Sequence, residues 1–258
     1  MTMIELLRRI NPLVLCITND VVKPFTANSL LALGASPIMS GEKKEMADII
    51  KHSGAVLINI GTCSEDKIEL YETAAREANQ SQVPLIIDPV GYGASTFRRN
   101  VINHILENHK VDLIKGNTGE IMALAGLDVE SKGVDSIAEG KAEEIVKVAY
   151  DKLKVPILVT GETDAYTNGE TIISMNNGHE FQEKITGSGC VLGAICASFL
   201  AVDRTQDAIV KAVSLYNIAA EQAALSTSGP GMFQVQLIDE MYKFSEADYQ
   251  KSKVTVHE

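Results

Sequence analysis

The chain has 258 residues, of which 45% are hydrophobic and 22% charged, and this balance excludes a disordered or collagen-like protein. Its length predicts a single domain over residues 1–258, with a polar tail from about residue 245 that frays. With 23 basic and 34 acidic residues the net charge is −11, so we expect no nucleic-acid partner and no membrane partner.

Short apolar runs alternate with longer amphipathic stretches in the first part of the chain. The runs predict strands at Leu13–Ile17, Ala35–Met39, Ala55–Ile60, Val83–Asp88, Val111–Lys115 and Val155–Thr160. The amphipathic stretches predict helices at Thr26–Leu33, Lys43–Lys51, Glu65–Asn79, Thr96–Asn108 and Ala138–Lys152. Three successive strands start 28 residues apart, close to the ~30 residues of one βαβ unit. The pattern therefore predicts a parallel sheet with helices on both faces.

The pattern changes after residue 160. Asn168-Gly169 lies between two β-prone segments and favours a two-residue hairpin, and residues 176–178 form a second turn before residues 180–185. These turns predict an antiparallel extension of the sheet. The longest apolar run, Cys190–Val202, has 13 residues, whereas a bilayer span needs ~20, so we predict a buried helix. In all, three further helices are predicted, at Ser188–Val202, Thr205–Leu225 and Met232–Phe244.

The cysteines indicate a reducing compartment, and the histidines do not indicate a transition-metal site in the protein. The four cysteines, at positions 16, 63, 190 and 196, have no CxxC spacing and lie largely in apolar stretches, as free thiols do. The five histidines lack the spacing of paired metal ligands. Charged residues interrupt the first eleven positions, which argues against a secretory leader. We therefore expect a cytoplasmic protein.

Candidate ligand-binding residues follow the strands, because open parallel sheets bind ligands beyond the carboxyl ends of their strands. Asp88 ends an apolar run and is followed by Pro89, Val90 and Gly91. A carboxylate there suits a hydrated Mg²⁺, which proteins hold through one or two carboxylates and substrate phosphates. On this segment alone, opening a turn is the favoured role for Asp88.

The next strand is followed by a polar segment, Lys115-Gly116-Asn117-Thr118-Gly119-Glu120. Asn117 and Glu120 have the spacing of a helix capping box, so capping is at least as well supported for Glu120 as a metal role. Capping does not explain Lys115, a cation at the ligand edge of an acidic protein. A phosphate partner for Lys115 and a metal-bound water for Glu120 explain both. Thr160, at the end of the following strand, either contacts nucleotide phosphate or merely ends the strand.

The sharpest motif is Thr186-Gly187-Ser188-Gly189-Cys190, directly before an apolar helix. Glycines at a helix start let several backbone N–H groups and the positive end of the helix dipole face an anion. The spacing is neither that of a P-loop nor GxGxxG. The alternative is tight packing, with Cys190 as a small apolar residue.

Together these segments resemble the ribokinase-like kinases and, within them, the hydroxyethylthiazole kinase family of thiamine salvage. The resemblance spans nearly the whole chain, and Cys190 discriminates most, because the wider superfamily usually has aspartate in that position. It implies a three-layer ribokinase-like α/β fold, with a mostly parallel central sheet, an antiparallel extension and helices on both faces. The segments that carry it are Ile17-Thr18-Asn19, Ile87–Gly91, Lys115–Glu120, Val159–Gly161, Gly187–Cys190 and Gly229–Gly231.

The resemblance also implies an activity and a role for each matching residue. The activity is phosphorylation of 4-methyl-5-(2-hydroxyethyl)thiazole by ATP, with Mg²⁺ as cofactor, in a homotrimer. Lys115 stands where related enzymes often carry arginine, and it lacks the bidentate fork of that side chain. Whether Asn19 and Met39 serve their own or a neighbouring subunit's site stays open. The implied groups are catalytic Cys190, Gly187 and Gly189, thiazole-binding Asn19, Met39 and Gly187, ATP-binding Lys115 and Thr160, and Mg²⁺-organising Asp88 and Glu120.

Cys190 would face the hydroxyl of the substrate, either as a base or as a lining residue. Phosphoryl transfer usually has a loose transition state, so positioning and charge neutralisation outweigh proton removal. A thiol with a pKa of ~8.5 is roughly 3% thiolate at pH 7, and a helix N-terminus that lowers the pKa by one raises this to about 24%. Cys190 is therefore a plausible but weak base.

Three alternative functions stay open on the sequence. One is a kinase for hydroxymethylpyrimidine or another small vitamin alcohol, against which Cys190 and Met39 argue. Another is the hydro-lyase that repairs hydrated nicotinamide cofactor, which shares the general fold. The third is a non-catalytic nucleotide-binding protein on the same scaffold, although none of the candidate site residues is missing.

Overall fold

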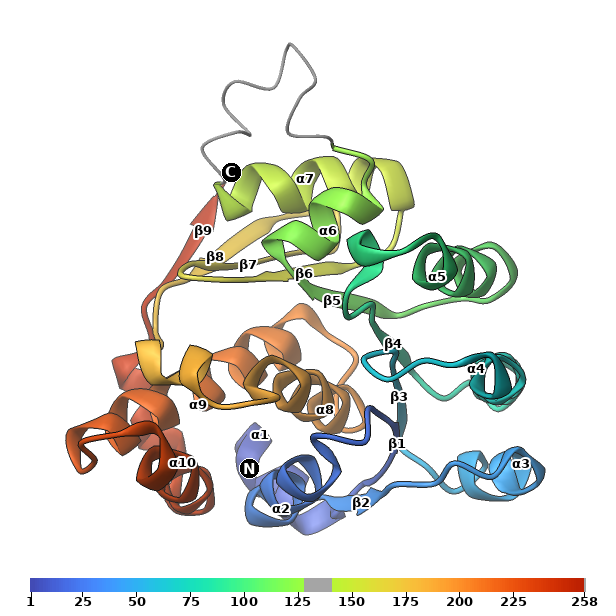
Figure 1. The fold of residues 1–258 in the computed structure, drawn as a ribbon. Helices are drawn as coiled ribbons and strands as arrows, with labels where there is room; N and C mark the ends of the chain where they lie inside the picture. Colours follow the sequence, from blue (N-terminus) through green and yellow to red (C-terminus); the bar gives the residue numbers. More distant parts are fainter. Residues whose placement is uncertain (128–140, 258) are drawn as a thin grey trace.

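The computed structural model of the protein describes residues 1–127 and 141–257. Within these residues, one sheet lies between two layers of helices (Figure 1). Its strands lie in the spatial order β2-β1-β3-β4-β5-β6-β7-β8-β9. Their bounds are β1 Leu13–Ile17, β2 Ser36–Ile38, β3 Ala55–Asn59, β4 Leu85–Asp88, β5 Leu113–Asn117, β6 Ile157–Thr160, β7 Asp164–Thr167, β8 Ile172–Met175 and β9 Val254–His257.

The sheet has a parallel and an antiparallel part, as predicted. Neighbouring strands from β2 to β6 pair in parallel, so their carboxyl ends meet at one edge. β7, β8 and β9 extend the sheet in antiparallel fashion. Asn168 and Gly169 join β7 to β8, and Gly169 has a φ of +93°, a left-handed conformation that glycine adopts readily.

Helices cover both faces because each interior strand is apolar on both sides. In β1, Val14 and Cys16 belong to one hydrophobic cluster, whereas Leu15 and Ile17 belong to the other. The first cluster includes residues of α1, α2, α8, α9 and α10, and the second includes residues of α3 to α7. The helices are α1 Met3–Ile10, α2 Lys23–Leu33, α3 Met46–Ile50, α4 Ile68–Gln80, α5 Thr96–Asn108, α6 Thr118–Leu124, α7 Ala142–Leu153, α8 Ser188–Leu200, α9 Gln206–Leu225 and α10 Pro230–Lys243, with short 3₁₀ helices η1 Lys43–Glu45, η2 Glu65–Lys67, η3 Tyr92–Ala94, η4 Glu180–Lys184 and η5 Glu246–Lys251.

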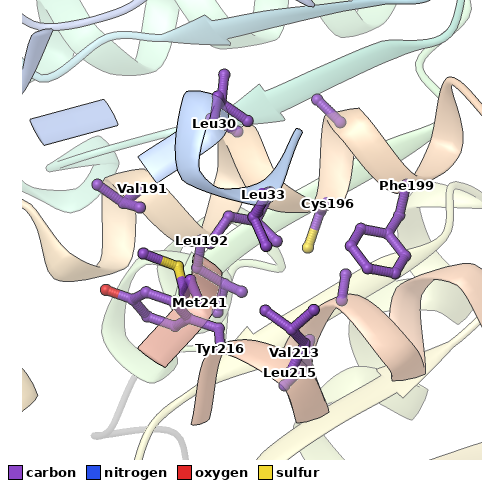
Figure 2. Close-up of a cluster of buried hydrophobic side chains, with 14 of the residues drawn as sticks. Leu30, Leu33, Val191, Leu192, Cys196, Phe199, Val213, Leu215, Tyr216 and Met241 are labelled. Carbon is purple, nitrogen blue, oxygen red and sulfur yellow. The ribbon is translucent and has the colours of Figure 1, made fainter. Parts of the chain in front are cut away.

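α8 lies in the middle of the first cluster and is buried over most of its length. Figure 2 shows apolar side chains of α8, such as Phe199, meeting those of α2, α9 and α10, such as Leu33 and Met241. Gly193 faces the sheet, where a Cβ would make only ordinary van der Waals contact, 3.4 Å from Leu57 Cδ1 and 3.6 Å from Asp88 Oδ2. The packing therefore holds the start of α8 over the carboxyl ends of the parallel strands. Among the described residues, no helix is long and apolar enough to cross a membrane.

The C-terminal tail contradicts the prediction that it frays. Residues 246–251 form η5, and β9 then pairs with β8. Tyr249 packs edge-on against Phe244, with ring centroids 5.0 Å apart, and the Asn177 side chain bonds to the backbone of Lys251 and Lys253. These contacts order a polar segment. They join residues that are distant in the sequence or that lie outside the periodic pattern of the chain.

Several boundaries also differ from the prediction. The strand expected at Val111–Lys115 is β5, which runs on to Asn117 because its last residues pair with β6 up to Thr160. Residues 180–184 form η4, and β9 supplies the outer antiparallel strand. For the helix expected at Ala138–Lys152, residues 138–140 lie outside the described residues, and α7 covers the remainder from residue 142.

Candidate active site

Strands β3, β4 and β5 bring a buried polar cluster to the carboxyl edge of the sheet. Asn59 ends β3, Asp88 ends β4 and Lys115 lies in β5, and none of the three is more than 3% exposed. Asn59 Nδ2 donates to Asp88 Oδ2 at 2.8 Å, and Lys115 Nζ lies 3.5 Å from the same oxygen. The parallel register thus joins two of the residues that the sequence analysis selected.

Asp88 has features that suit a cation ligand. Burial raises the pKa of Asp88 to about 6, Lys115 opposes this rise, and the neighbouring carboxylate of Glu120 adds to it. Asp88 Oδ1 is buried without a hydrogen-bond partner in the described part of the chain. A divalent ion would pair with the unpartnered oxygen and would reduce the repulsion between the two carboxylates.

These residues therefore fit Mg²⁺. Asp88 and Glu120 would supply the carboxylates that hold the ion or its waters. No group of three or more His, Cys, Asp or Glu side chains suited to a metal occurs within residues 1–127 and 141–257. Mg²⁺ usually keeps several waters and binds substrate phosphate as well as one or two carboxylates.

Glu120 also caps a helix, the alternative role considered for it. Glu120 Oε2 accepts from the N–H of Asn117 and Asn117 Oδ1 accepts from the N–H of Glu120, both at 2.9 Å, which completes a capping box at the start of α6. Glu120 Oε1 accepts from the N–H of Gly91 at 2.9 Å. The capping contact is thus confirmed, while the metal role stays a prediction. The two are compatible, because each carboxylate oxygen has a second lone pair.

Lys115 places a buried positive charge beneath the glycine-rich loop. Burial alone lowers the pKa of Lys115, but Asp88, Cys190 and Glu120 together raise it, and the net pKa lies above its ordinary value. The side chain therefore stays charged. Lys115 Nζ lies 3.4 Å from the point that a Cβ on Gly189 would occupy. The ammonium group and the N-terminus of α8 therefore present positive charge at one place.

Cys190 is linked to this cluster through two amides. Asn19 Nδ2 donates to Cys190 Sγ at 3.3 Å and to Asn59 Oδ1 at 3.0 Å, and Asn59 in turn binds Asp88. Burial, followed by the Asp88 charge, raises the pKa of Cys190, and Lys115 opposes the rise. Desolvation of the thiolate is the largest cause of this rise, and it acts against the lowering that a helix N-terminus would give.

The glycine-rich loop begins α8, as the motif predicts. Gly187 is the residue before the helix and has a φ of +85°, and a Cβ there would lie 2.0 Å from Val22 Cγ1. The Ser188 hydroxyl lies 2.8 Å from that of Tyr216, which also donates to the Ser188 carbonyl at 3.1 Å. Backbone conformation and these buried hydrogen bonds hold the loop in one arrangement.

A cavity of about 940 Å³ lies beside the loop, a size suited to a nucleotide. Thr160 is in its wall, where the threonine hydroxyl donates to the Gly116 carbonyl at 3.3 Å. Gly189 lines the same cavity and also adjoins Lys115, so the cavity and the buried polar cluster meet at this residue. The lining comprises Asn117, Thr160, Gly161, Glu162, Thr163, Asp164, Asn176, Asn177, Gly178, His179, Glu180, Gln182, Glu183, Ser188, Gly189, Leu192, Tyr216 and Asn217.

Met39 lies apart from these groups. It follows β2, is half-buried, and packs against the hydrophobic cluster around α8. The wall of the 940 Å³ cavity, as far as the structure describes it, does not include Met39. The structure therefore gathers Asn19, Asp88, Lys115 and Cys190 but leaves the predicted thiazole contact of Met39 untested.

Two site residues escaped the sequence analysis. Asn59 is a polar residue at the end of an apolar strand, the signal that selected Asp88, and could have been found by the same rule. Asp164 lines the cavity, accepts from Asn217 Nδ2 at 2.6 Å and from the Gly161 N–H at 3.0 Å, and has a pKa that burial raises to about 6. Its pairing with Asn217, 53 positions away, has no sequence signal.

Comparison with known proteins places this site in a family. The model of the hydroxyethylthiazole kinase family matches residues 4–247. The chain belongs to the hydroxyethylthiazole kinase family. A curated relative, hydroxyethylthiazole kinase 1 of Streptococcus pneumoniae strain P1031, is 43% identical over 257 residues, which cover 98% of this chain and 99% of the relative. Membership of the hydroxyethylthiazole kinase family confirms the resemblance drawn from the motifs.

Solved structures of related proteins agree. The structure of hydroxyethylthiazole kinase from Pyrococcus horikoshii OT3 superposes with a TM-score of 0.92 at 36% identity and covers 99% of this chain and 98% of that one. A ribokinase-like superfamily protein from Enterococcus faecalis V583 has a TM-score of 0.65 at 16% identity, covering 95% and 96% of the two chains, and shows the fold alone. The predicted ribokinase-like fold is thus confirmed.

Proposed function

We propose that the protein transfers the γ-phosphoryl group of ATP to the hydroxyl of 4-methyl-5-(2-hydroxyethyl)thiazole, giving the thiazole phosphate for thiamine phosphate synthesis. Membership of the hydroxyethylthiazole kinase family supports the substrate. The observation that carries the proposal is the meeting of the nucleotide-sized cavity and the buried Asp88–Lys115 pair at Gly189. Space for a donor nucleotide, carboxylates that fit a cation and an anion-binding helix start therefore lie at one place.

In the proposed complex, ATP occupies the 940 Å³ cavity. Thr160 in its wall offers a hydroxyl to the phosphates, and Lys115 offers its charge from below the loop. The N–H groups that follow Gly187 would face the migrating phosphoryl group, because this residue begins α8. These groups stabilise negative charge with little rearrangement, which is where phosphoryl transfer gains most of its rate.

The thiazole alcohol is proposed to bind on the other side of the loop, at Asn19, Gly187 and Met39, with its hydroxyl near Cys190. Asn19 is 6% exposed and already bonded to Cys190 Sγ, so the amide can orient the thiol and an incoming hydroxyl together. Asn59 keeps that amide in place through its Oδ1. Cysteine in place of aspartate distinguishes this family within the superfamily, and this cysteine therefore lies among the residues proposed to contact the substrate.

During the reaction, the hydroxyl oxygen forms a bond to the γ-phosphorus while the bond from that phosphorus to the β-phosphate oxygen breaks; ADP leaves, and the hydroxyl proton is released to water. Bound Mg²⁺ supplies charge neutralisation for the phosphate oxygens. Asp88 and Glu120 would hold the ion, and Lys115 balances the remaining charge. Because burial raises the pKa of Cys190, its thiolate is scarce at neutral pH, and the thiol contributes more by orienting the hydroxyl than by removing its proton.

A coupled assay of ADP release tests substrate, donor and metal together. We expect ADP release that requires both the thiazole alcohol and Mg²⁺, with hydroxymethylpyrimidine turned over far more slowly at equal concentration. A faster rate with the pyrimidine alcohol would assign the protein to the other vitamin branch. ATP binding without ADP release in the presence of either alcohol would indicate a non-catalytic nucleotide-binding protein.

The proposal extends to assembly and compartment. Exposed apolar side chains lie on α2 and α10, two helices that contact each other, and we infer that they contribute to the interface of the proposed homotrimer; they are Leu31, Met232, Val235 and Tyr242. Light scattering during gel filtration tests this, with a mass three times that of the chain expected. All four cysteines are free thiols, which supports the reducing cytoplasm as the compartment.

A further inference from the structure

One arginine lies outside the buried polar cluster of the candidate active site. It joins two loops that surround this cluster. Arg98 lies in the first turn of α5, and its guanidinium group donates to three backbone carbonyls. Nη1 donates to Ile60 at 2.6 Å and to Val90 at 2.7 Å, and Nη2 donates to Gly61 at 2.9 Å. Two of these acceptors follow β3 and one follows β4.

These acceptors are directly connected to the residues proposed to hold Mg²⁺. Ile60 follows Asn59, which donates to Asp88, and Val90 lies two positions after Asp88. The next residue, Gly91, donates its N–H to Glu120 Oε1 and has a φ of +69°. The guanidinium group thus connects the loop after β3 to the turn after β4. That turn follows Asp88 and contacts Glu120, so it links the two carboxylates.

The three bonds require the planar shape of a guanidinium group. Its fork holds donors at fixed angles and can serve three acceptors at once, whereas an ammonium group on a flexible stem cannot reproduce that spacing. Charge alone does not explain the arrangement, because all three partners are neutral carbonyls. The neighbouring Arg99 shows the contrast, since its contacts are to Gly93 and Thr96 at 3.4 Å on the exposed side of the helix.

We propose that Arg98 is a positioning residue for the divalent-cation site, which sets the distance between Asp88 and Glu120 by clamping the loops after β3 and β4. It touches neither substrate nor metal. The inference rests on the proposed function, since it needs Mg²⁺ at these carboxylates. Its effect should appear first in cation affinity and in kcat, and less in the KM for the thiazole alcohol, because Arg98 reaches the proposed thiazole contact Asn19 only through the backbone of Gly61.

The test compares R98K with R99K in two measurements. Binding of Mn²⁺ to the enzyme–ADP complex, followed by electron paramagnetic resonance, reports the cation site without turnover. The Mg²⁺ concentration at half-maximal rate of ADP release reports it during catalysis. We expect R98K to weaken Mn²⁺ binding and to raise the half-saturating Mg²⁺ about tenfold, with the thiazole KM changed less than threefold, and R99K to match the unsubstituted protein.

A second variant covers the case in which R98K fails to fold. G91A strains the same turn, because Gly91 has a positive φ, while a Cβ there meets Arg98 only at an ordinary 3.5 Å. We expect it to weaken Mn²⁺ binding in the same direction. Unchanged cation binding in a folded R98K, or in G91A if R98K does not fold, overturns the positioning role. An unsubstituted protein that binds Mn²⁺ but phosphorylates no thiazole would instead refute the proposed function.

Discussion

Asn59 donates a hydrogen bond to one oxygen of the Asp88 carboxylate, at 2.8 Å, and the other oxygen is left buried without a partner in the described chain. This asymmetry gives the two oxygens different roles. Oδ2 is held by Asn59 and by the ammonium of Lys115, whereas Oδ1 is available to a cation or its water. The amide therefore orients a carboxylate whose burial raises its pKa to about 6.

The first prediction follows from this contact. N59A removes the donor to Asp88 and the acceptor that holds Asn19, so Asp88 can turn and the thiol loses its oriented amide. We expect kcat to fall about tenfold and the half-saturating Mg²⁺ to rise, because a hydrogen bond to a charged group is worth roughly 1.5–3 kcal/mol. Steady-state rates over a Mg²⁺ series measure both, and a variant with unchanged kinetics would show that Asn59 serves stability alone.

The second prediction separates the two roles of Glu120. E120Q keeps an acceptor for the capping box, which tolerates Gln in this position, but it removes the negative charge and the oxygen that accepts from Gly91. We expect the half-saturating Mg²⁺ to rise about tenfold, with a thermal midpoint within a few degrees of the original. Mg²⁺ titrations and thermal melts run on the same preparation check this. If only the midpoint changes, Glu120 is a capping residue and no more.

The third prediction concerns Cys190. C190A should lower kcat by about 10–100-fold, near the low end of what a general base contributes, because charge neutralisation supplies most of the rate. C190D should stay active, since it restores the usual residue of the superfamily and can still accept from Asn19. Rates of ADP release for both variants provide the measurement. A folded but inactive C190D would contradict the assigned role.

The fourth prediction addresses the loop conformation. G187A forces a side chain into a residue with φ of +85° and places its Cβ 2.0 Å from Val22 Cγ1, so either the loop or α2 must shift. We expect a loss of about 2 kcal/mol or more in the free energy of unfolding, together with weaker ATP binding. The control is G231A, where a Cβ meets nothing within 4 Å. Urea unfolding and nucleotide titrations compare the two, and equal behaviour would remove the argument for a strained loop.

The fifth prediction is a pH dependence set by Asp164. Burial raises the pKa of Asp164 to about 6 from 3.8, so the unfolded chain releases this proton first as the pH rises. Between about pH 4 and pH 6 the folded state holds more protons, and Asp164 therefore lowers the free energy of unfolding as the pH increases. At pH 7 this loss corresponds to about 3 kcal/mol.

D164N removes the titration and isolates it. Relative to the original protein, we expect this variant to gain about 3 kcal/mol of stability between pH 4 and pH 7. Denaturant unfolding at both pH values measures the difference. A stability difference that is the same at the two pH values would show that Asp164 titrates as an ordinary carboxyl group.

Much of the fold was predictable because local patterns report local physics. Strands buried on both faces appear as continuous apolar runs, and Asn168-Gly169 specifies its hairpin through backbone conformation. The tail was not predictable, because residues 254–257 are ordered by pairing with β8 across the molecule. No periodicity within a polar segment records a distant partner.

The amino-acid sequence by itself determined which residues stand at strand ends and at the start of α8, since continuous apolar runs place Asp88 and Thr160 and the glycine motif before an apolar helix places Gly187. Only the tertiary structure decided what they touch. α8 packs against the sheet with Gly193 beside Asp88, and burial raises the pKa of Cys190 although the helix dipole favours the thiolate. Desolvation depends on every atom that surrounds a group, and that environment exists only once the chain has folded.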